Sequence, residues 1–270
     1  MHVGKWSGGA QALVAFALVL PQNATAQERP GSSADSKLPL KPPASKSSGW
    51  EFEISPYVWV TGVHGTVGVR DRTAEVDVSF RKLLENLDGA IMLAVEGASG
   101  PWSVGIDLIY VNVSKQTGTP GPLFSSAELD VRQAIVEGSV RRRIVVTRRV
   151  QAGVLAGGRW WKLNNTLRLG AGALPGVDLD LDKGWIDPFV GGRVLADLSE
   201  HLVLQARADV GGFNVQSDFT WQALGTLGYR ISDRVTARAG YRHLDVDYEN
   251  DGFIYDIRMG GLIAGVTIAF

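Results

Sequence analysis

The sequence predicts an all-β protein: a transmembrane, antiparallel, up-and-down β-barrel, most simply of ten strands within a range of eight to twelve. Three observations predict it. Apolar and polar residues alternate with period two in repeated stretches of about ten residues, the connections between stretches alternate between short and long, and no apolar run reaches the ~18 residues of a membrane helix. We expect the barrel to occupy residues 50–270.

The length, the charge and the lack of cysteine exclude several kinds of protein and of site. The chain has 270 residues, of which 45% are hydrophobic and 20% charged, with no cysteine and a formal net charge of −1. The length allows one sizeable domain, or two small ones at most. The lack of cysteine excludes a disulfide framework, a cysteine-ligated metal site and a thiol nucleophile. We expect no nucleic-acid partner, because such a partner selects a net basic surface, and we expect no cofactor.

The N-terminal region has the pattern of an exported protein. Residues 1–26 resemble a secretory signal peptide, because Lys5 precedes a short apolar block that ends at Pro21, and small residues suited to cleavage follow. Residues 27–49 are rich in Pro, Ser and Lys and show no apolar period, which predicts a disordered periplasmic linker.

The alternation is the main evidence for strands. In 218–231, for example, apolar residues such as Trp221 fall on one face, whereas Gln222 and Arg230 fall on the other. A helix would scatter these charges around its axis, but a strand sorts them onto one side. The predicted strands are 50–61, 89–99, 102–113, 127–141, 149–163, 185–197, 202–213, 218–231, 234–247 and 253–270.

The connections predict which end of the barrel faces the periplasm. Short turns on one side and longer loops on the other are the layout of an outer-membrane barrel. Short turns are expected near 99–101, 142–147, 198–201 and 232–233, and longer loops at 62–88, 114–126, 164–184, 214–217 and 248–252. Hairpin extensions above the membrane are expected where Thr66–Val69 meets Glu75–Ser79 and where Leu167–Gly170 meets Val177–Leu181.

One helix is predicted in the first external loop. Phe80, Leu83, Leu84 and Leu87 recur at helical spacing, and Ser79 stands at a suitable N-cap position. We expect this short amphipathic helix to pack as a lid on the barrel mouth rather than to bind a partner.

The C-terminal stretch resembles the insertion signal of bacterial outer-membrane barrels. Leu262, Val266, Ile268 and Phe270 fall on one apolar face of the last strand, and the sequence ends on an aromatic residue. The departure is Ile268, where many such proteins carry an aromatic residue. The resemblance implies contact with the barrel-assembly machinery through Phe270.

Alternation alone leaves open a soluble, lipocalin-like barrel with its apolar face inside. The charges favour the opposite arrangement. If the five arginines of the polar face met lipid, each would cost about 2–4 kcal/mol and all five roughly 10–20 kcal/mol, more than ordinary folding stability allows. We therefore predict a charge network within the lumen, formed by Glu53, Glu96, Asp107, Glu137, Arg159, Asp187, Arg193, Arg207, Asp209, Arg230 and Arg238.

Five segments together resemble an uncharacterised family of Gram-negative outer-membrane β-barrel proteins, related to the OmpA-type and OmpW-type small barrels. The segments are WEFEISPYVWVTGVHGTVGV, AEVDVSFRKLLENLDGA, WIDPFVGGR, SDFTWQALGTLGYR and YRHLDVDYE, and the resemblance covers nearly all of 50–270. It implies a closed barrel in the outer membrane, in contact with lipid and lipopolysaccharide. It brings no assigned activity, so no catalytic residue is carried over.

The predicted function is a structural or narrow-pore barrel whose lumen is largely filled by side chains. Ten strands enclose a lumen only slightly wider than that of eight, which side chains can fill. We expect a monomer and no enzymatic activity. The alternative is a surface-recognition or adhesin barrel that acts through loops 62–88 and 164–184.

A rim-site enzyme is the third hypothesis. His243, Asp245 and Asp247 share one face, which allows a His–Asp acid–base pair, but no G-x-S-x-G elbow is present. The same acidic run could bind Ca²⁺ or bridge to lipopolysaccharide, although its spacing matches no EF-hand loop. We favour a hydrated rim at the top of the strand, and predict no metal site.

Overall fold

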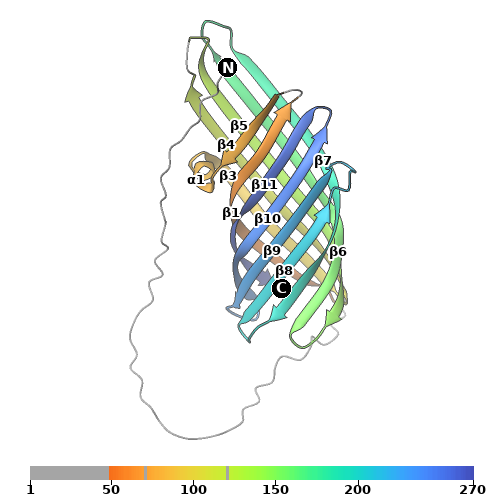
Figure 1. Cartoon of the computed structure of the whole chain (residues 1–270). Helices are drawn as coiled ribbons and strands as arrows, with labels where there is room; N and C mark the ends of the chain where they lie inside the picture. Colours follow the sequence, from red (N-terminus) through yellow and green to blue (C-terminus); the bar gives the residue numbers. More distant parts are fainter. Residues whose placement is uncertain (1–48, 70–71, 120–121) are drawn as a thin grey trace, which may run out of the picture. The chain divides into compact units, whose positions relative to one another are not determined.

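A computed structural model describes residues 49–69, 72–119 and 122–270, so the predicted signal peptide and, apart from Gly49, the predicted linker lie outside the described residues. The described chain contains eleven strands and one short helix (Figure 1). In chain order these are β1 (Glu51–Val69), β2 (Arg72–Val78), α1 (Phe80–Glu85), β3 (Leu87–Ser99), β4 (Trp102–Gly118), β5 (Phe124–Val146), β6 (Val150–Ala171), β7 (Val177–Asp197), β8 (Leu202–Gly211), β9 (Phe219–Arg230), β10 (Val235–Asn250) and β11 (Phe253–Ala269).

The strands form a closed antiparallel ring, as the sequence predicts. The order runs from β11 down to β3, then β1 and β2, and β11 also pairs with β1. Ten strands of the described chain therefore close the barrel, while β2 pairs only with the part of β1 from Val63 to Val69. We call the end with the longer loops the upper end (top in Figure 1).

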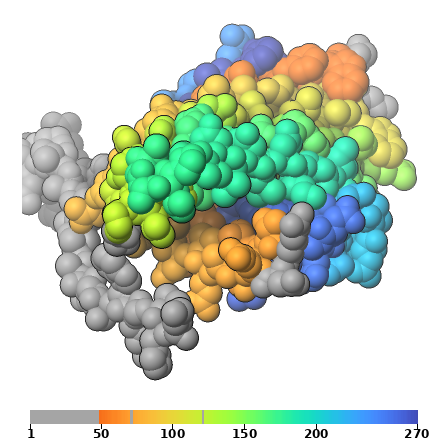
Figure 2. All heavy atoms as spheres, turned by 90° about the horizontal axis from the view of Figure 1, so that it is seen from above, coloured from red at the N-terminus to blue at the C-terminus, as the bar shows by residue number. Residues whose placement is uncertain are grey.

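Both predicted hairpin extensions are confirmed. Thr66 lies opposite Glu75 between β1 and β2, and Leu167 lies opposite Leu179 between β6 and β7. Strands β5, β6 and β7 have 23, 22 and 21 residues, and they rise above the rest of the barrel on one side (Figure 1). In the view from above, the green residues of this extension stand nearest the reader (Figure 2).

The predicted helix forms, but not as a lid. Helix α1 follows Ser79 as its N-cap residue, none of its residues is buried, and Leu84 is 55% exposed. It lies beside the barrel wall near β1 and β3 (Figure 1), so the expectation that it covers the mouth is wrong. The reason is that β2 pairs with the upper part of β1 and runs back down beside it, which leaves α1 next to the wall and away from the mouth. In the described residues, no helix is long and apolar enough to span a membrane.

An apolar belt surrounds the lower part of the barrel. Ile106 is 56% exposed and Leu262 is 65% exposed, both on the outer face. Aromatic residues border the belt on β9, where Trp221 and Tyr229 lie eight positions apart. That spacing is about 27 Å along a strand and roughly 20 Å along the axis of a barrel with strands tilted by about 40°, close to the height of a lipid-facing band.

Above this belt the two faces of the wall exchange character. On β10 the outward positions change from Tyr241 to His243 and Asp245, while the inward positions change from Arg242 to Leu244. The residue parity is unchanged, since the strand continues without interruption. Along β10 the outside of the barrel is therefore apolar within the belt and polar above it, and the inside is polar within the belt and apolar above it.

Candidate functional site

The candidate site is the interior of the ring. Inward-facing side chains line or fill it at three successive levels. From the lower end these are a chamber, an ion-pair layer and an aromatic layer. The ion-pair layer comprises Tyr57, Asp107, Glu137, Arg159, Arg207, Asp209, Thr220, Gln222 and Arg242. Successive levels lie two to four residues apart along a strand, as at Ile135, Glu137 and Arg141 of β5, because alternate residues face inward.

Glu137 on β5 is at the centre of the ion-pair layer and is 2% exposed. Its carboxylate accepts hydrogen bonds from Arg159 Nε at 2.8 Å, Arg207 Nη2 at 2.8 Å and Arg242 Nη2 at 3.1 Å. One carboxylate thus links guanidinium groups from three other strands. Such charge-assisted bonds are the strong class of hydrogen bond, and here they are removed from solvent.

Arg159 on β6 is completely buried. Besides Glu137, it donates from Nη2 to Asp209 at 2.7 Å and from Nη1 to Thr220 at 3.1 Å, and its guanidinium lies 5.1 Å from the Phe189 ring centroid. A buried arginine is tolerated only when its donors and charge are matched. The ion-pair layer supplies both the acceptors and the opposite charges, and the Phe189 ring packs against the guanidinium of Arg159.

Arg242 on β10 closes the layer across the barrel. It donates to Asp107 at 2.8 Å and to Gln222 at 2.7 Å, and its guanidinium lies 5.0 Å from the Trp59 ring centroid. Tyr57 donates to the same Asp107 at 2.6 Å. These contacts join β1, β4, β9 and β10, so the layer spans the lumen.

Asp187 forms a separate polar anchor beside the layer. Its carboxylate accepts hydrogen bonds from Trp185 Nε1 at 3.1 Å, from the Ser217 amide at 2.9 Å and from the Ser217 hydroxyl at 2.7 Å. All three residues are buried. The anchor ties the loop between β8 and β9 to the inside of β7.

The aromatic layer lies directly above. Trp185 stacks on Tyr248 with ring centroids 4.1 Å apart and on Trp161 at 5.6 Å, and Tyr255 meets Trp161 edge-on at 6.3 Å. Trp161 has no exposed surface. The layer comprises Trp59, Ile109, Ile135, Trp161, Leu163, Trp185, Leu244, Val246, Tyr248, Phe253, Tyr255, Ile257 and Met259. It packs the upper barrel as the core of a water-soluble β-barrel is packed.

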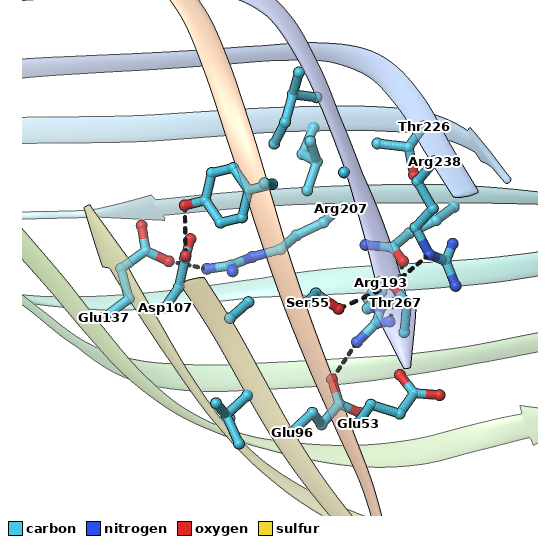
Figure 3. A pocket seen from close by; sticks show the side chains of 18 of the residues that line it. Glu53, Ser55, Glu96, Asp107, Glu137, Arg193, Arg207, Thr226, Arg238 and Thr267 are labelled. Atoms are coloured by element: carbon cyan, nitrogen blue, oxygen red, sulfur yellow. Dashed lines mark hydrogen bonds and ion pairs between the residues drawn. The ribbon is translucent and has the colours of Figure 1, made fainter. Parts of the chain in front are cut away.

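The chamber lies below the ion-pair layer and has a volume of about 170 Å³ (Figure 3). On one side Glu96 accepts hydrogen bonds from Arg141 and Arg193, and Arg141 also donates to Ser103 at 2.9 Å. On the other side Arg238 donates from Nε to Thr267 at 3.0 Å. The chamber is therefore lined by guanidinium, carboxylate and hydroxyl groups.

The structure distributes the predicted charge network over these levels. Asp107, Glu137, Arg159, Arg207 and Asp209 meet in the ion-pair layer, Glu96 meets Arg193 in the chamber, and Glu53 and Arg238 also line the chamber. Asp187 forms its own anchor. Arg230 lies apart from the rest and pairs with Asp197 near the lower turns.

Sequence reasoning missed two arginines that the structure places in the interior. Arg242 lies four positions after Arg238, and Arg141 lies four positions after Glu137, so each shares the inward face of its strand. Alternation could have found both. Alternation places Tyr57 and Gln222 on the polar face as well, but nothing in the sequence shows that these uncharged residues join the ion-pair layer.

The outer rim holds the residues of the enzyme hypothesis. His243 Nε2 lies 3.8 Å from Asp245 Oδ2, which Arg258 Nε approaches to 3.1 Å, and the His243 ring packs on Trp221 with centroids 4.5 Å apart. Burial raises the pKa of Asp245 although Arg258 and His243 oppose the shift. The group faces away from the interior, a geometry that favours the rim interpretation. Within the described residues, no cluster of three His, Asp or Glu side chains is arranged to hold a metal.

The predicted insertion-signal residues lie on the outer face of β11 and at its end. Leu262, Val266, Ile268 and Phe270 are 65%, 37%, 40% and 70% exposed. Phe270 exchanges two backbone hydrogen bonds with Phe52 on β1, and their rings stack at 6.2 Å. The terminal aromatic residue therefore completes both the lower edge of the belt and the seam of the barrel.

Comparison with known proteins supports the fold. No protein-family model and no curated protein sequence matches the chain. Among solved structures, the outer-membrane protease OmpT of Escherichia coli superposes with a TM-score of 0.52 at 11% identity, covering 85% of this chain and 99% of OmpT. Neisserial surface protein A gives a TM-score of 0.33 at 12% identity over 82% and 99%, and the P. putida toluene transporter TodX gives 0.31 at 13% over 82% and 89%.

The likeness to OmpT shows the fold: this chain folds as an antiparallel β-barrel of the kind that OmpT forms. At 11% identity it shows nothing about activity. The contents of the lumen, rather than the architecture of the wall, therefore have to carry any inference about function.

Proposed function

We propose that this chain is an integral protein of the bacterial outer membrane whose lumen is closed by its own side chains, and which serves a structural, non-conducting role. The observation that carries the proposal is the pair of stacked layers across the ring. Glu137 and Arg159 in the ion-pair layer, and Trp161 and Trp185 in the aromatic layer, are each at most 3% exposed. An ion would have to break both layers to pass.

Planar-bilayer recording tests this proposal. We expect the purified full-length protein to insert without steady current steps, and Arg207→Ala to behave alike because the aromatic layer remains intact. Arg207 is suitable because it belongs to the ion-pair layer but only lies at its edge, with 14% of its side chain exposed. Large, steady, porin-like steps from the unmodified protein would contradict closure. A known porin in the same bilayer controls for insertion.

The location has its own tests. The apolar belt supports insertion in a bilayer. We propose that residues 1–26 direct export and that the barrel contacts outer-membrane lipid and lipopolysaccharide. We also propose that the protein is a monomer and that Phe270 contacts the barrel-assembly machinery. Cell fractionation should recover the protein with outer membranes, and Phe270→Ser should lower its yield there. Val215→Ser, an exposed apolar residue in the loop between β8 and β9, is the matched control. Recovery in the soluble periplasmic fraction would overturn the location.

Surface recognition is a second candidate, and a specific observation favours it. Above the belt, the extension formed by β5–β7 exposes apolar side chains, including Leu129 at 43%, Leu174 at 45% and Leu179 at 53%. Exposed apolar groups in an aqueous setting often mark an interaction surface. Replacing residues 164–184 by a short turn should abolish the binding of host or phage proteins by whole cells. Unchanged binding would exclude this extension as the contact.

A further inference from the structure

The chamber contains hydrogen-bond donors that the described chain leaves without an acceptor. Arg238 Nη1 and Thr226 Oγ1 both belong to residues lining the chamber, both atoms are buried, and neither has a hydrogen-bond partner among the described residues. Thr226 is 6% exposed. Arg141 Nε and Arg193 Nε, also in the lining, are likewise buried without a partner among the described residues. Buried polar groups are almost always satisfied, so unmatched donors gathered in one cavity call for a partner in that cavity.

Arg238 is held so that its free nitrogen stays available. Its Nε donates to Thr267 Oγ1 at 3.0 Å, and that hydroxyl forms a further hydrogen bond of 2.9 Å with Ser55. Gly228 lies opposite Arg238 on β9, and a Cβ atom at Gly228 would come within 3.4 Å of Nη1. The side chain is thus fixed at Nε, and its Nη1 lies beside β9, where a Cβ atom at Gly228 would only touch it.

The charges of the chamber favour an anion. Five arginines and four carboxylates line the chamber, which leaves one positive charge in excess. Arg207, Arg242, Asp107 and Glu137 among them belong to the ion-pair layer that forms its roof. Below the roof, Arg141, Arg193 and Arg238 face Glu53 and Glu96, and Glu96 is already bound by both Arg141 and Arg193. A guanidinium only donates hydrogen bonds, so its partner must accept them. Water would supply an acceptor, but an oxyanion supplies several acceptors and also balances the excess positive charge.

The chamber can be reached from the lower end only. The side chains of Glu96, Arg193 and Arg141 are 24%, 14% and 12% exposed, whereas Arg159 and Glu137 above them are 0% and 2% exposed. Solvent therefore enters as far as the chamber and stops at the ion-pair layer. A volume of about 170 Å³ holds a small ion together with several waters.

We propose that the chamber is a binding site for a small oxyanion of the phosphate class, taken up from the periplasmic end and held by Arg238 and Thr226. Arg193 and Arg141 contribute positive charge. The site is a dead end, since the layers above it are closed, so it binds an anion without transporting it.

Isothermal titration calorimetry tests the site, with the full chain folded in detergent and sodium phosphate titrated against chloride at equal ionic strength. We expect saturable binding at one site. Arg238→Gln should weaken it roughly ten- to hundredfold, the usual effect of losing a charge-assisted hydrogen bond. Thr226→Val should weaken it several-fold without lowering the urea midpoint, because the hydroxyl has no partner in the described chain. Glu53→Gln should tighten it.

Arg234→Gln is the matched control, since Arg234 is exposed in the turn before β10 and carries the same charge outside the chamber. It should leave phosphate binding unchanged. Equal weakening by Arg234→Gln and Arg238→Gln would indicate general attraction to a basic surface and overturn the site. Absence of saturable heat with phosphate would also overturn it. Heat-dependent gel mobility checks that each variant folds, and Thr226→Val decides the question if Arg238→Gln does not.

Discussion

The ion-pair layer gives the most direct test of the interior. Glu137→Gln keeps the shape of the side chain but removes the charge that three arginines share. The amide offers one acceptor oxygen, and its NH₂ group faces guanidinium donors. Arg159, Arg207 and Arg242 each donate to Glu137 over distances of 2.8 to 3.1 Å, so all three lose part of their compensation.

The expected loss in the free energy of unfolding depends on the carboxylate partners that each arginine retains. Arg159 and Arg207 keep Asp209 at 2.7 and 2.9 Å, and Arg242 keeps Asp107 at 2.8 Å. The loss is therefore smaller than three full charge-assisted bonds of about 1.5–3 kcal/mol each. Breaking a buried ion pair from one side costs about 3–5 kcal/mol, and we expect Glu137→Gln to lower the free energy of unfolding by that amount.

Urea unfolding in detergent, followed by tryptophan fluorescence, measures this difference. Glu128→Gln is the matched control, because Glu128 is on the same strand, is 41% exposed and meets Arg168 at 3.4 Å. An exposed pair of this kind contributes at most about 1 kcal/mol. If Glu137→Gln unfolds within about 1 kcal/mol of the parent, the layer does not stabilise the barrel as its geometry implies.

Three further predictions concern the other levels and the outer surface. Trp185→Ala should destabilise the protein by about 3–5 kcal/mol through a cavity in the aromatic layer, yet bilayer recordings should stay silent because the ion-pair layer remains; new current steps would contradict this. Ile106→Arg, on the outer face of the belt, should cost about 2–4 kcal/mol in vesicle-based unfolding, whereas Leu179→Arg above the belt should cost almost nothing; equal costs would misplace the bilayer. Burial and the neighbouring Asp256 raise the pKa of Asp247 at the upper rim. The folded state therefore binds the Asp247 proton more tightly than the unfolded state does. The stability that this proton contributes is present in acid and is lost as the pH rises through the raised pKa. Asp247→Asn should therefore raise the urea midpoint at pH 7 and not at pH 3, and a gain independent of pH would refute the repulsion.

Much of the wall could be predicted because it depends on local periodicity. A lipid-facing strand must place apolar groups at every second residue, so the alternation on β9 and β11 identified strand, face and belt together. Helix α1 also followed from local spacing. Its position did not, since that depends on where β2 pairs with β1.

The exchange of faces above the belt has a signal in the sequence of β10. Leu244, Val246 and Tyr248 occupy the same parity as Arg242, and they are apolar because the interior there forms a core while water lies outside. The signal is a change in which parity is apolar, at the point where His243 begins the polar outer face. A search for such changes would locate the bilayer boundary on each strand.

By itself, the sequence determined a β-barrel with an apolar outside, charges directed inward and long loops at one end, because each of these depends on residues close together in the chain. Only the tertiary structure decided which charges meet. Arg242 reaches Asp107 and Glu137 across 135 and 105 positions of sequence, and Arg238 reaches Thr267 instead of a carboxylate. Those partners depend on ring closure and on the register of every intervening strand, in which a shift of one residue would turn each side chain to the opposite face.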